Sequence, residues 1–409
     1  MTEPDRSRRV RLVLCGRDGE PVGALPWFVV DDPWWPEVEP VVRAARDRFG
    51  VDAIVLRLLS AETDSTVMGG SVSYLAEVDE VPRKARIEPV DPDIAGPDSV
   101  LRAYWARPGG VEATLAWADA HLAAIGRPRT DPAVQVKTWN LSSILRLPTS
   151  AGDAWCKSVP PFMAHEGAII ALVGAQDPSL VPVVLAAHPR SGTVLMVGIE
   201  GEDQWEAPED RLIGMVHRLV ALQARWIGDV PTLLSAGLPD VRARAFMDTV
   251  SALLRRADVR SQLTADELDR LDGVVADLPR RLAALRGCGL PDTLVHGDFH
   301  PGNWRSSGGD LVLVDWGDSG VGHPLLDLPG FLQRVPEGAR ERVRSAWLDA
   351  WHGERPDADV QRAAELIPSI AALYAAVTYQ RFLDHIEPSE RVYHQLDVPI
   401  CLRRALTEG

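Results

Sequence analysis

Residues 296–304 read HGDFHPGNW and residues 311–316 read LVLVDW, and these two stretches decide the fold prediction. Apolar segments lie at 290–295 and 311–314, and the loop with Asp298 and Asn303 lies between them. Asp315 follows directly after the second apolar segment. Asp, Asn, His, Gly and Pro are ordinary turn residues. A turn alone, however, does not require another acid at the end of the next strand, so the pattern indicates a site.

The three side chains suit phosphoryl transfer. Asp298 and Asn303 are five residues apart, which is the Asp-to-Asn spacing of the protein kinase catalytic loop. Asp315 takes the place of the aspartate in the kinase Asp-Phe-Gly motif. ATP chemistry needs one group that orients the acceptor hydroxyl and at least two oxygen ligands for Mg2+. Asp298 fits the first role as the catalytic residue, and Asn303 and Asp315 fit the second as metal ligands.

On these motifs the chain resembles the aminoglycoside phosphotransferase family, the protein-kinase-like small-molecule kinases. The family loop reads His-Gly-Asp-x-His-x-x-Asn and is followed by Asp-Trp or Asp-Phe. Residues 322–328, GHPLLDL, are similar to a further family stretch, Gly-x-Pro-x-x-Asp-Leu. In that family the last acid, here Asp327, anchors the catalytic loop, and we expect His296 and His300 to support the loop as well.

The resemblance implies an α+β, protein-kinase-like bilobal fold with a small antiparallel-sheet N-lobe and a mainly helical C-lobe. It runs from about residue 133 to the C-terminus, so we expect an additional small α+β N-terminal domain. The predicted division is 1–126 for this extension or cap, 133–200 for the N-lobe and 201–409 for the C-lobe. Within the C-lobe, segments 337–351, 360–384 and 391–407 are predicted helices.

The predicted N-lobe contains two further candidates for nucleotide binding. Lysine occurs at only three positions in this arginine-rich chain, and Lys157 lies on the third of three predicted antiparallel strands. A kinase-like fold places its phosphate-binding lysine there. Glu166 lies in the helix predicted downstream, and the resemblance implies that it pairs with Lys157.

The resemblance also places the adenine of ATP against the backbone near Val197 and Ile199, where a predicted strand ends. The turn between the first two N-lobe strands, 138–143, reads TWNLSS and has none of the glycines of the protein kinase phosphate loop. Its backbone amides and hydroxyl groups are candidates for phosphate contacts.

Composition limits the classes of protein. The chain has 409 residues, 46% hydrophobic and 25% charged, as expected for a globular protein of two or three domains. Its net charge of -15 argues against a nucleic-acid or anionic-membrane binder. No apolar run approaches the length of a membrane span, and the four cysteines lack metal-ligand spacing. We therefore expect a cytoplasmic protein.

The sequence thus predicts an ATP- and Mg2+-dependent phosphotransferase acting on a hydroxyl of a small molecule, such as an aminoglycoside-like antibiotic, an amino sugar or a sugar. Six acids between residues 200 and 210 favour an acceptor with positive charge. Part of this acidity also fits a helix N-terminus. The competing hypothesis is a catalytically silent kinase-like binding or regulatory module. The acceptor, the role of the extension and the oligomeric state stay open.

Overall fold

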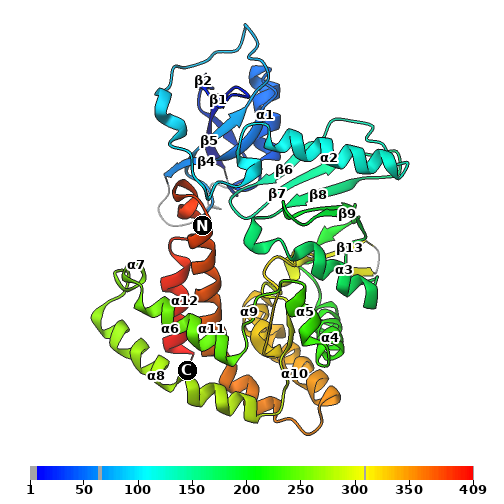
Figure 1. The fold of residues 1–409 in the computed structure, drawn as a ribbon, viewed down its shortest axis with the longest axis vertical. Coiled ribbons are helices and arrows are strands. Elements are labelled where there is room, and N and C mark those ends of the chain that lie inside the picture. The colour runs from blue at the N-terminus through cyan, green and yellow to red at the C-terminus, as the bar shows by residue number, and fades with distance from the viewer. Residues whose placement is uncertain (1–6, 63–66, 308–309, 409) are drawn as a thin grey trace. The chain divides into compact units, whose positions relative to one another are not determined.

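The computed structural model describes residues 7–62, 67–307 and 310–408, which form two compact units (Figure 1). Unit one contains Met1–Ala164, Val184–Gly198 and Phe382–Gln395; unit two contains His165–Val183, Ile199–Arg381 and Leu396–Gly409. None of the helices in the described ranges combines the length and the apolar character needed to cross a membrane. The predicted three-part division at residues 126, 133 and 200 remains a proposal.

Unit one begins with a five-stranded sheet and one covering helix. The elements are β1 (Arg8–Cys15), β2 (Pro21–Ala24), β3 (Phe28–Val30), α1 (Glu39–Phe49), β4 (Ile54–Glu62) and β5 (Ser71–Glu77). The strand order is β2-β1-β5-β4, with β3 also paired to β1. Side chains alternate between the two faces of β1, so Leu12 packs toward α1 while Val13 packs against the other face. This sheet lies within residues 1–126, the stretch predicted as an α+β extension.

A second sheet in unit one is antiparallel throughout. Its strands are β6 (Val134–Thr138), β7 (Ser143–Leu147), β8 (Ala154–Ser158), β9 (Val184–His188) and β10 (Thr193–Val197), in the order β6-β7-β8-β10-β9. The helix α2 (Gly110–Ala124) packs on it, because Ala118 and Leu122 share a buried cluster with Leu145 and Cys156. Short 3-10 turns, η1 (Pro92–Ala95) and η2 (Tyr104–Ala106), precede α2.

The chain returns to unit one near its C-terminus. The helix α11 (Val360–His385) is followed by the 3-10 helix η6 (Pro388–Tyr393), which lies beside β4 (Figure 1). We call residues 382–395 the C-terminal insert. The predicted continuous helix over 391–407 is therefore wrong: an α-helix, α12 (Asp397–Thr407), begins only after the insert. Pro399 fits the first turn of α12, whereas in a helix from residue 391 it would interrupt the hydrogen bonding.

Unit two is mainly helical. The 3-10 helix η3 (Pro161–Met163) ends the first segment of unit one. Besides α11 and α12, unit two contains α3 (Glu166–Gln176), β11 (Glu202–Asp203), α4 (Glu209–Trp226), α5 (Val230–Ser235), α6 (Ala243–Arg255), α7 (Ala257–Arg260), α8 (Ala265–Gly287), β12 (Thr293–Val295), η4 (Pro301–Asn303), β13 (Trp304–Ser307), β14 (Asp310–Leu313), β15 (Gly320–Gly322), η5 (Pro324–Leu326), α9 (Asp327–Arg334) and α10 (Glu337–Glu354). Two small sheets, β11-β13-β14 and β12-β15, frame the loop predicted to be catalytic. The α+β class and the antiparallel-sheet and helical regions of the kinase-like prediction are confirmed.

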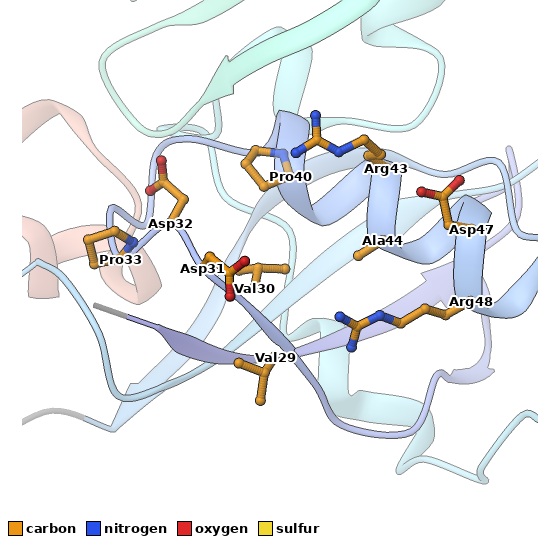
Figure 2. A pocket seen from close by; sticks show the side chains of 10 residues that line it. All are labelled: Val29, Val30, Asp31, Asp32, Pro33, Pro40, Arg43, Ala44, Asp47 and Arg48. Atoms are coloured by element: carbon orange, nitrogen blue, oxygen red, sulfur yellow. The ribbon is translucent and has the colours of Figure 1, made fainter. Parts of the chain in front are cut away.

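Unit one also has a hollow of about 610 Å3 between α1 and the loop after β3. Figure 2 shows Arg43 and Arg48 on α1 and Asp31 and Asp32 on that loop. The lining mixes both signs of charge and contains none of the predicted site residues.

Candidate active site

The loop after β12 is held by a buried acid. Asp327 accepts hydrogen bonds from the backbone N–H groups of His296, at 2.9 Å, and Gly297, at 2.8 Å. Burial raises the pKa of Asp327 to about 7, although these two donors favour the ionised form. The His296 ring is fully buried, lies 3.2 Å from the carbonyl oxygen of Val314 and packs on Trp316. Both residues brace the loop, as predicted.

Gly297 is the position where the loop requires glycine. Its φ is 87°, in the region that side chains disfavour. A Cβ atom there would also collide with the carbonyl oxygen of Asp318. Glycine at this position therefore allows the turn that leads into Asp298.

Asp298 lies among three polar side chains. The Asn303 amide nitrogen donates to the Asp298 carbonyl oxygen, at 2.8 Å, and to its carboxylate Oδ2, at 3.1 Å. His300 Nε2 lies 3.3 Å from Oδ2, and Arg334 Nη2 lies 3.8 Å from Oδ1. The Asp298 side chain keeps 35% of its area exposed, so the carboxylate is both held and reachable.

These neighbours control the charge of Asp298. Burial acts to raise its pKa, but the hydrogen bond and charge of His300 and the charge of Arg334 outweigh that effect. The net result holds the pKa of the Asp298 carboxyl well below its usual range. An ionised carboxylate at this place is able to accept a hydrogen bond from a hydroxyl group.

Asn303 and Asp315 are tied together through the backbone. The N–H of Val314, the residue before Asp315, donates to the Asn303 carbonyl oxygen at 2.9 Å. Among the described residues, Asp315 is the only non-glycine residue with a positive φ, 65°. Such a conformation is tolerated best by Asn and Asp and is often retained at functional positions.

The donor set of these two residues suits Mg2+. Because the Asn303 amide nitrogen is engaged by Asp298, its oxygen is the atom left to act as a ligand. Within the described ranges, no group of three or more His, Cys, Asp or Glu side chains is placed to bind a metal. A magnesium ion needs fewer protein ligands, since nucleotide phosphates and water complete its shell.

Glu166 contacts the same region. It is the first residue of α3 and is 2% exposed, and its Oε1 accepts a hydrogen bond from the Trp316 N–H at 3.1 Å. The buried carboxylate thereby fixes the backbone directly after Asp315. Lys157 lies on β8 in unit one and is 8% exposed. Its pairing with Glu166 would join the two units and stays a prediction.

The segment predicted to bind adenine lies at a unit boundary. Val197 is the last residue of β10, and the units divide between Gly198 and Ile199. The Gly198 N–H donates to the carbonyl oxygen of Asp153 at 2.7 Å, and a Cβ at Gly198 would clash with that oxygen. Adenine binding by the backbone of Val197 and Ile199 stays a prediction.

Two residues beside Asp298 were not predicted. Trp205 stacks on the His300 ring, with centroids 4.8 Å apart and 15° between planes, and is 46% exposed. It also covers Gly302, where a Cβ would meet the indole. The other residue is Arg334, at the end of α9. A tryptophan among acidic residues was a weak signal in the sequence for Trp205, and no sequence pattern pointed to Arg334.

The acidic stretch before α4 divides into two parts. Glu209 lies in the first turn of α4 and forms an ion pair with Arg342. Glu202 and Asp203 form β11 and are exposed, as are the neighbouring acids Glu200, Glu206 and Asp210. The helix-terminus interpretation therefore accounts for Glu209 and Asp210, both in the first turn of α4, while the β11 acids face solvent.

Comparisons with known proteins find a matching family profile and similar solved structures. The profile described as "Phosphotransferase enzyme family" matches residues 121–366. Among solved structures, a macrolide 2'-phosphotransferase from Brachybacterium faecium is 16% identical, with a TM-score of 0.49, covering 69% of this chain and 97% of that one. A choline/ethanolamine kinase family protein from Mesorhizobium loti is 20% identical, with a TM-score of 0.47 and coverage of 72% and 98%. Choline kinase from Streptococcus pneumoniae is 14% identical, with a TM-score of 0.49 and coverage of 72% and 99%. No curated protein sequence matches significantly.

Proposed function

Because the chain belongs to the phosphotransferase enzyme family, we propose that it transfers the γ-phosphoryl group of ATP to a hydroxyl group of a small molecule, with Mg2+. One observation carries this proposal: a reachable Asp298 carboxylate, kept ionised, is hydrogen-bonded to Asn303, whose carbonyl oxygen accepts from Val314, the residue before Asp315. This is the set of groups that phosphoryl transfer needs.

In the proposed reaction Asp298 accepts a hydrogen bond from the acceptor hydroxyl and aims its oxygen at the γ-phosphorus. Asp298 takes the proton late, as the new P–O bond forms and the bond to ADP breaks. Asn303 and Asp315 would hold Mg2+, which when bound neutralises phosphate charge. Most of the rate enhancement then comes from positioning and electrostatics.

The remaining predicted site residues serve the nucleotide. Lys157, braced by Glu166, would neutralise charge on the phosphates, and the backbone of Val197 and Ile199 would bind adenine. The hydrogen bond from Trp316 to Glu166 supports a role near Asp315, because it fixes the backbone next to the metal ligand. A compact ammonium suits this place better than the forked guanidinium of arginine.

The acceptor is proposed to carry positive charge. The exposed carboxylates of Glu202 and Asp203 lie close in sequence to Trp205, whose indole stacks on His300 beside Asp298. Carboxylates and an exposed aromatic face together suit an amine or a quaternary ammonium group. We further propose a cytoplasmic enzyme without nucleic-acid or membrane partners, consistent with the net charge of -15.

The first test measures ADP release with Mg-ATP against a library of hydroxyl acceptors that includes aminoglycosides, amino sugars, choline-like alcohols and neutral sugars. We expect turnover with at least one acceptor, and Lys157→Arg should fail to restore the activity lost in Lys157→Ala. Wild-type-like turnover in Lys157→Arg would remove Lys157 from the site. A chain that binds no Mg-ATP would instead support the silent binding module.

Calorimetry with Mg-ATP tests the metal ligands separately. Asp315→Ala should weaken nucleotide binding more than Asp298→Ala, because a metal ligand acts in the ground state and a base acts mainly in the transition state. Equal affinities for wild type and Asp315→Ala would contradict the metal role.

A further inference from the structure

The turn between β6 and β7, residues 138–143, is buried in unit one. Asn140 is 4% exposed, and Leu141 and Ser142 are each 6% exposed. Within the turn, the Trp139 backbone N–H donates to the Ser142 carbonyl oxygen at 3.0 Å, and the Trp139 indole donates to the Ser142 hydroxyl at 2.9 Å. In protein kinases the loop between the first two strands covers the ATP phosphates and is glycine-rich. Here the corresponding turn is closed and contains no glycine.

The C-terminal insert contacts this turn directly. The Asn140 amide nitrogen donates to the Glu390 carbonyl oxygen at 3.2 Å, and the Asn140 amide oxygen lies 3.3 Å from His394 Nε2. The Trp139 ring packs against the rings of Tyr393, at 5.7 Å, and His394, at 5.6 Å. One short stretch of the insert therefore holds both the polar and the aromatic side chain at the tip of the turn.

The insert is itself anchored in the N-terminal sheet. The Glu390 carboxyl accepts a hydrogen bond from the Leu58 N–H on β4, at 3.1 Å. Glu387 forms ion pairs with Arg57, at 3.7 Å, and Arg102, at 3.0 Å, and all three side chains are at most 11% exposed. Buried pairs of this kind define one arrangement, because any displacement leaves charges without partners. The extension therefore holds the insert, and the insert holds the turn.

We propose that the C-terminal insert locks the 138–143 turn in one conformation so that its backbone is preorganised for the ATP phosphates, with Asn140 and Glu390 as positioning residues. The role in nucleotide binding rests on the proposed ATP-dependent function. A preorganised turn avoids the entropy cost of ordering a mobile loop when the nucleotide binds. This assigns the N-terminal extension a task in the reaction although it supplies no catalytic residue.

The test compares two matched variants of the full chain. Glu390→Ala removes a buried carboxyl that accepts a backbone N–H, and so does Glu77→Ala, since Glu77 accepts from Gly109 at 2.7 Å. The two side chains are 3% and 4% exposed. Because each loss leaves one backbone N–H without its carboxyl partner, the two variants should destabilise unit one similarly, but only Glu390 lies on the insert.

Hydrogen–deuterium exchange of a peptide covering 138–143 is the first measurement. We expect faster exchange in Glu390→Ala and in Asn140→Ala, and wild-type exchange in Glu77→Ala. Calorimetry should then show Mg-ATP binding roughly tenfold weaker in the first two variants, the scale of one lost hydrogen-bonded anchor, with little change in Glu77→Ala.

The outcomes separate the two proposals. Unchanged exchange of the turn in both Glu390→Ala and Asn140→Ala overturns the lock, whether or not nucleotide binds. Faster exchange with unchanged Mg-ATP affinity overturns the positioning role while leaving the proposed function intact. Failure of the wild type to bind Mg-ATP overturns the proposed function, and the exchange data still decide whether the insert fixes the turn.

Discussion

The catalytic loop and the C-terminal insert both place acidic side chains near arginine, with opposite results. Asp298 keeps 35% of its side chain exposed, and its neighbours hold its pKa low. Glu390 is 3% exposed, and burial, with the charge of Glu387, raises its pKa to about 8. The neighbours decide the difference: burial acts to raise both pKa values, but only at Asp298 do a hydrogen bond and nearby positive charges outweigh it. One carboxyl therefore stays charged and available for chemistry, and the other is part of the packing.

The largest expected effect is on turnover at the catalytic loop. Asp298→Ala should lower kcat by roughly two to four orders of magnitude, the usual scale for a general base. Its free energy of unfolding should change by less than about 1 kcal/mol, because the side chain is partly exposed. Rates of ADP release and a urea titration check both parts. Near wild-type turnover on the true acceptor would refute the role of Asp298.

In the insert we expect a large effect on stability, where the catalytic loop shows a large effect on turnover. Glu387→Ala should lower the free energy of unfolding by about 3 kcal/mol, since Arg57 and Arg102 would stay buried without their acidic partner. The exposed pair of Arg362 and Glu365 provides the control, and Glu365→Ala should cost at most about 0.5 kcal/mol. Equal unfolding midpoints for the two variants would show that the buried cluster adds no stability.

A smaller effect should appear in the pH dependence of stability. The groups that act electrostatically on Glu390 or share its pocket are Glu387, Arg57, Arg102, Tyr74 and Tyr393. The folded chain holds the Glu390 proton more tightly than the unfolded chain, whose glutamate pKa is about 4.5. The stability gained from Glu390 is therefore complete below about pH 4.5 and is lost as pH rises through about 8.

Glu390→Gln keeps an oxygen that accepts the Leu58 N–H and removes the titrating proton. Its unfolding free energy should thus fall less steeply than that of the wild type between about pH 5 and pH 8. Denaturant titrations at several pH values measure the slopes. Parallel slopes for the two proteins would mean that Glu390 titrates as an ordinary glutamate.

The smallest effect concerns acceptor encounter. If the acceptor is cationic, Glu202→Gln/Asp203→Asn should lower kcat/KM a few-fold at low salt, and the difference should shrink as ionic strength rises. A double variant of exposed acids elsewhere in unit two, Glu354→Gln/Asp357→Asn, should behave like the wild type. A neutral or anionic best acceptor would refute this proposal and leave the kinase assignment intact.

The catalytic loop could be predicted from local sequence. Asp298, Asn303 and Asp315 are close in the chain, and strand-loop-strand geometry brings them together without help from distant residues. Local patterns likewise predicted the three antiparallel strands that end with the one carrying Lys157, which correspond to β6, β7 and β8.

No local sequence pattern predicted the contacts of the insert. Leu58 and Glu390, or Asn140 and His394, are joined only by the tertiary fold, and a single buried glutamate is indistinguishable in sequence from a solvated one. Arg334 reaches Asp298 and Trp205 reaches His300 in the same way, from distant elements. The predicted helix over 391–407 failed because the insert is shaped by its partners in unit one, although Pro399 was a local signal against a continuous helix.

The N-terminal sheet is synthesised long before the insert that packs against it. The Leu58 N–H pairs with Glu390, which lies 332 positions later in the chain. Roughly twenty seconds to a minute of translation therefore separates the synthesis of these two residues. Until then the nascent extension exposes the surface that Tyr393 later covers beside Trp35 and Trp139. A ribosome that stops before residue 386 therefore releases a polypeptide whose N-terminal sheet lacks the contacts of the insert. Proteases or chaperones that recognise exposed apolar surface would bind such a polypeptide.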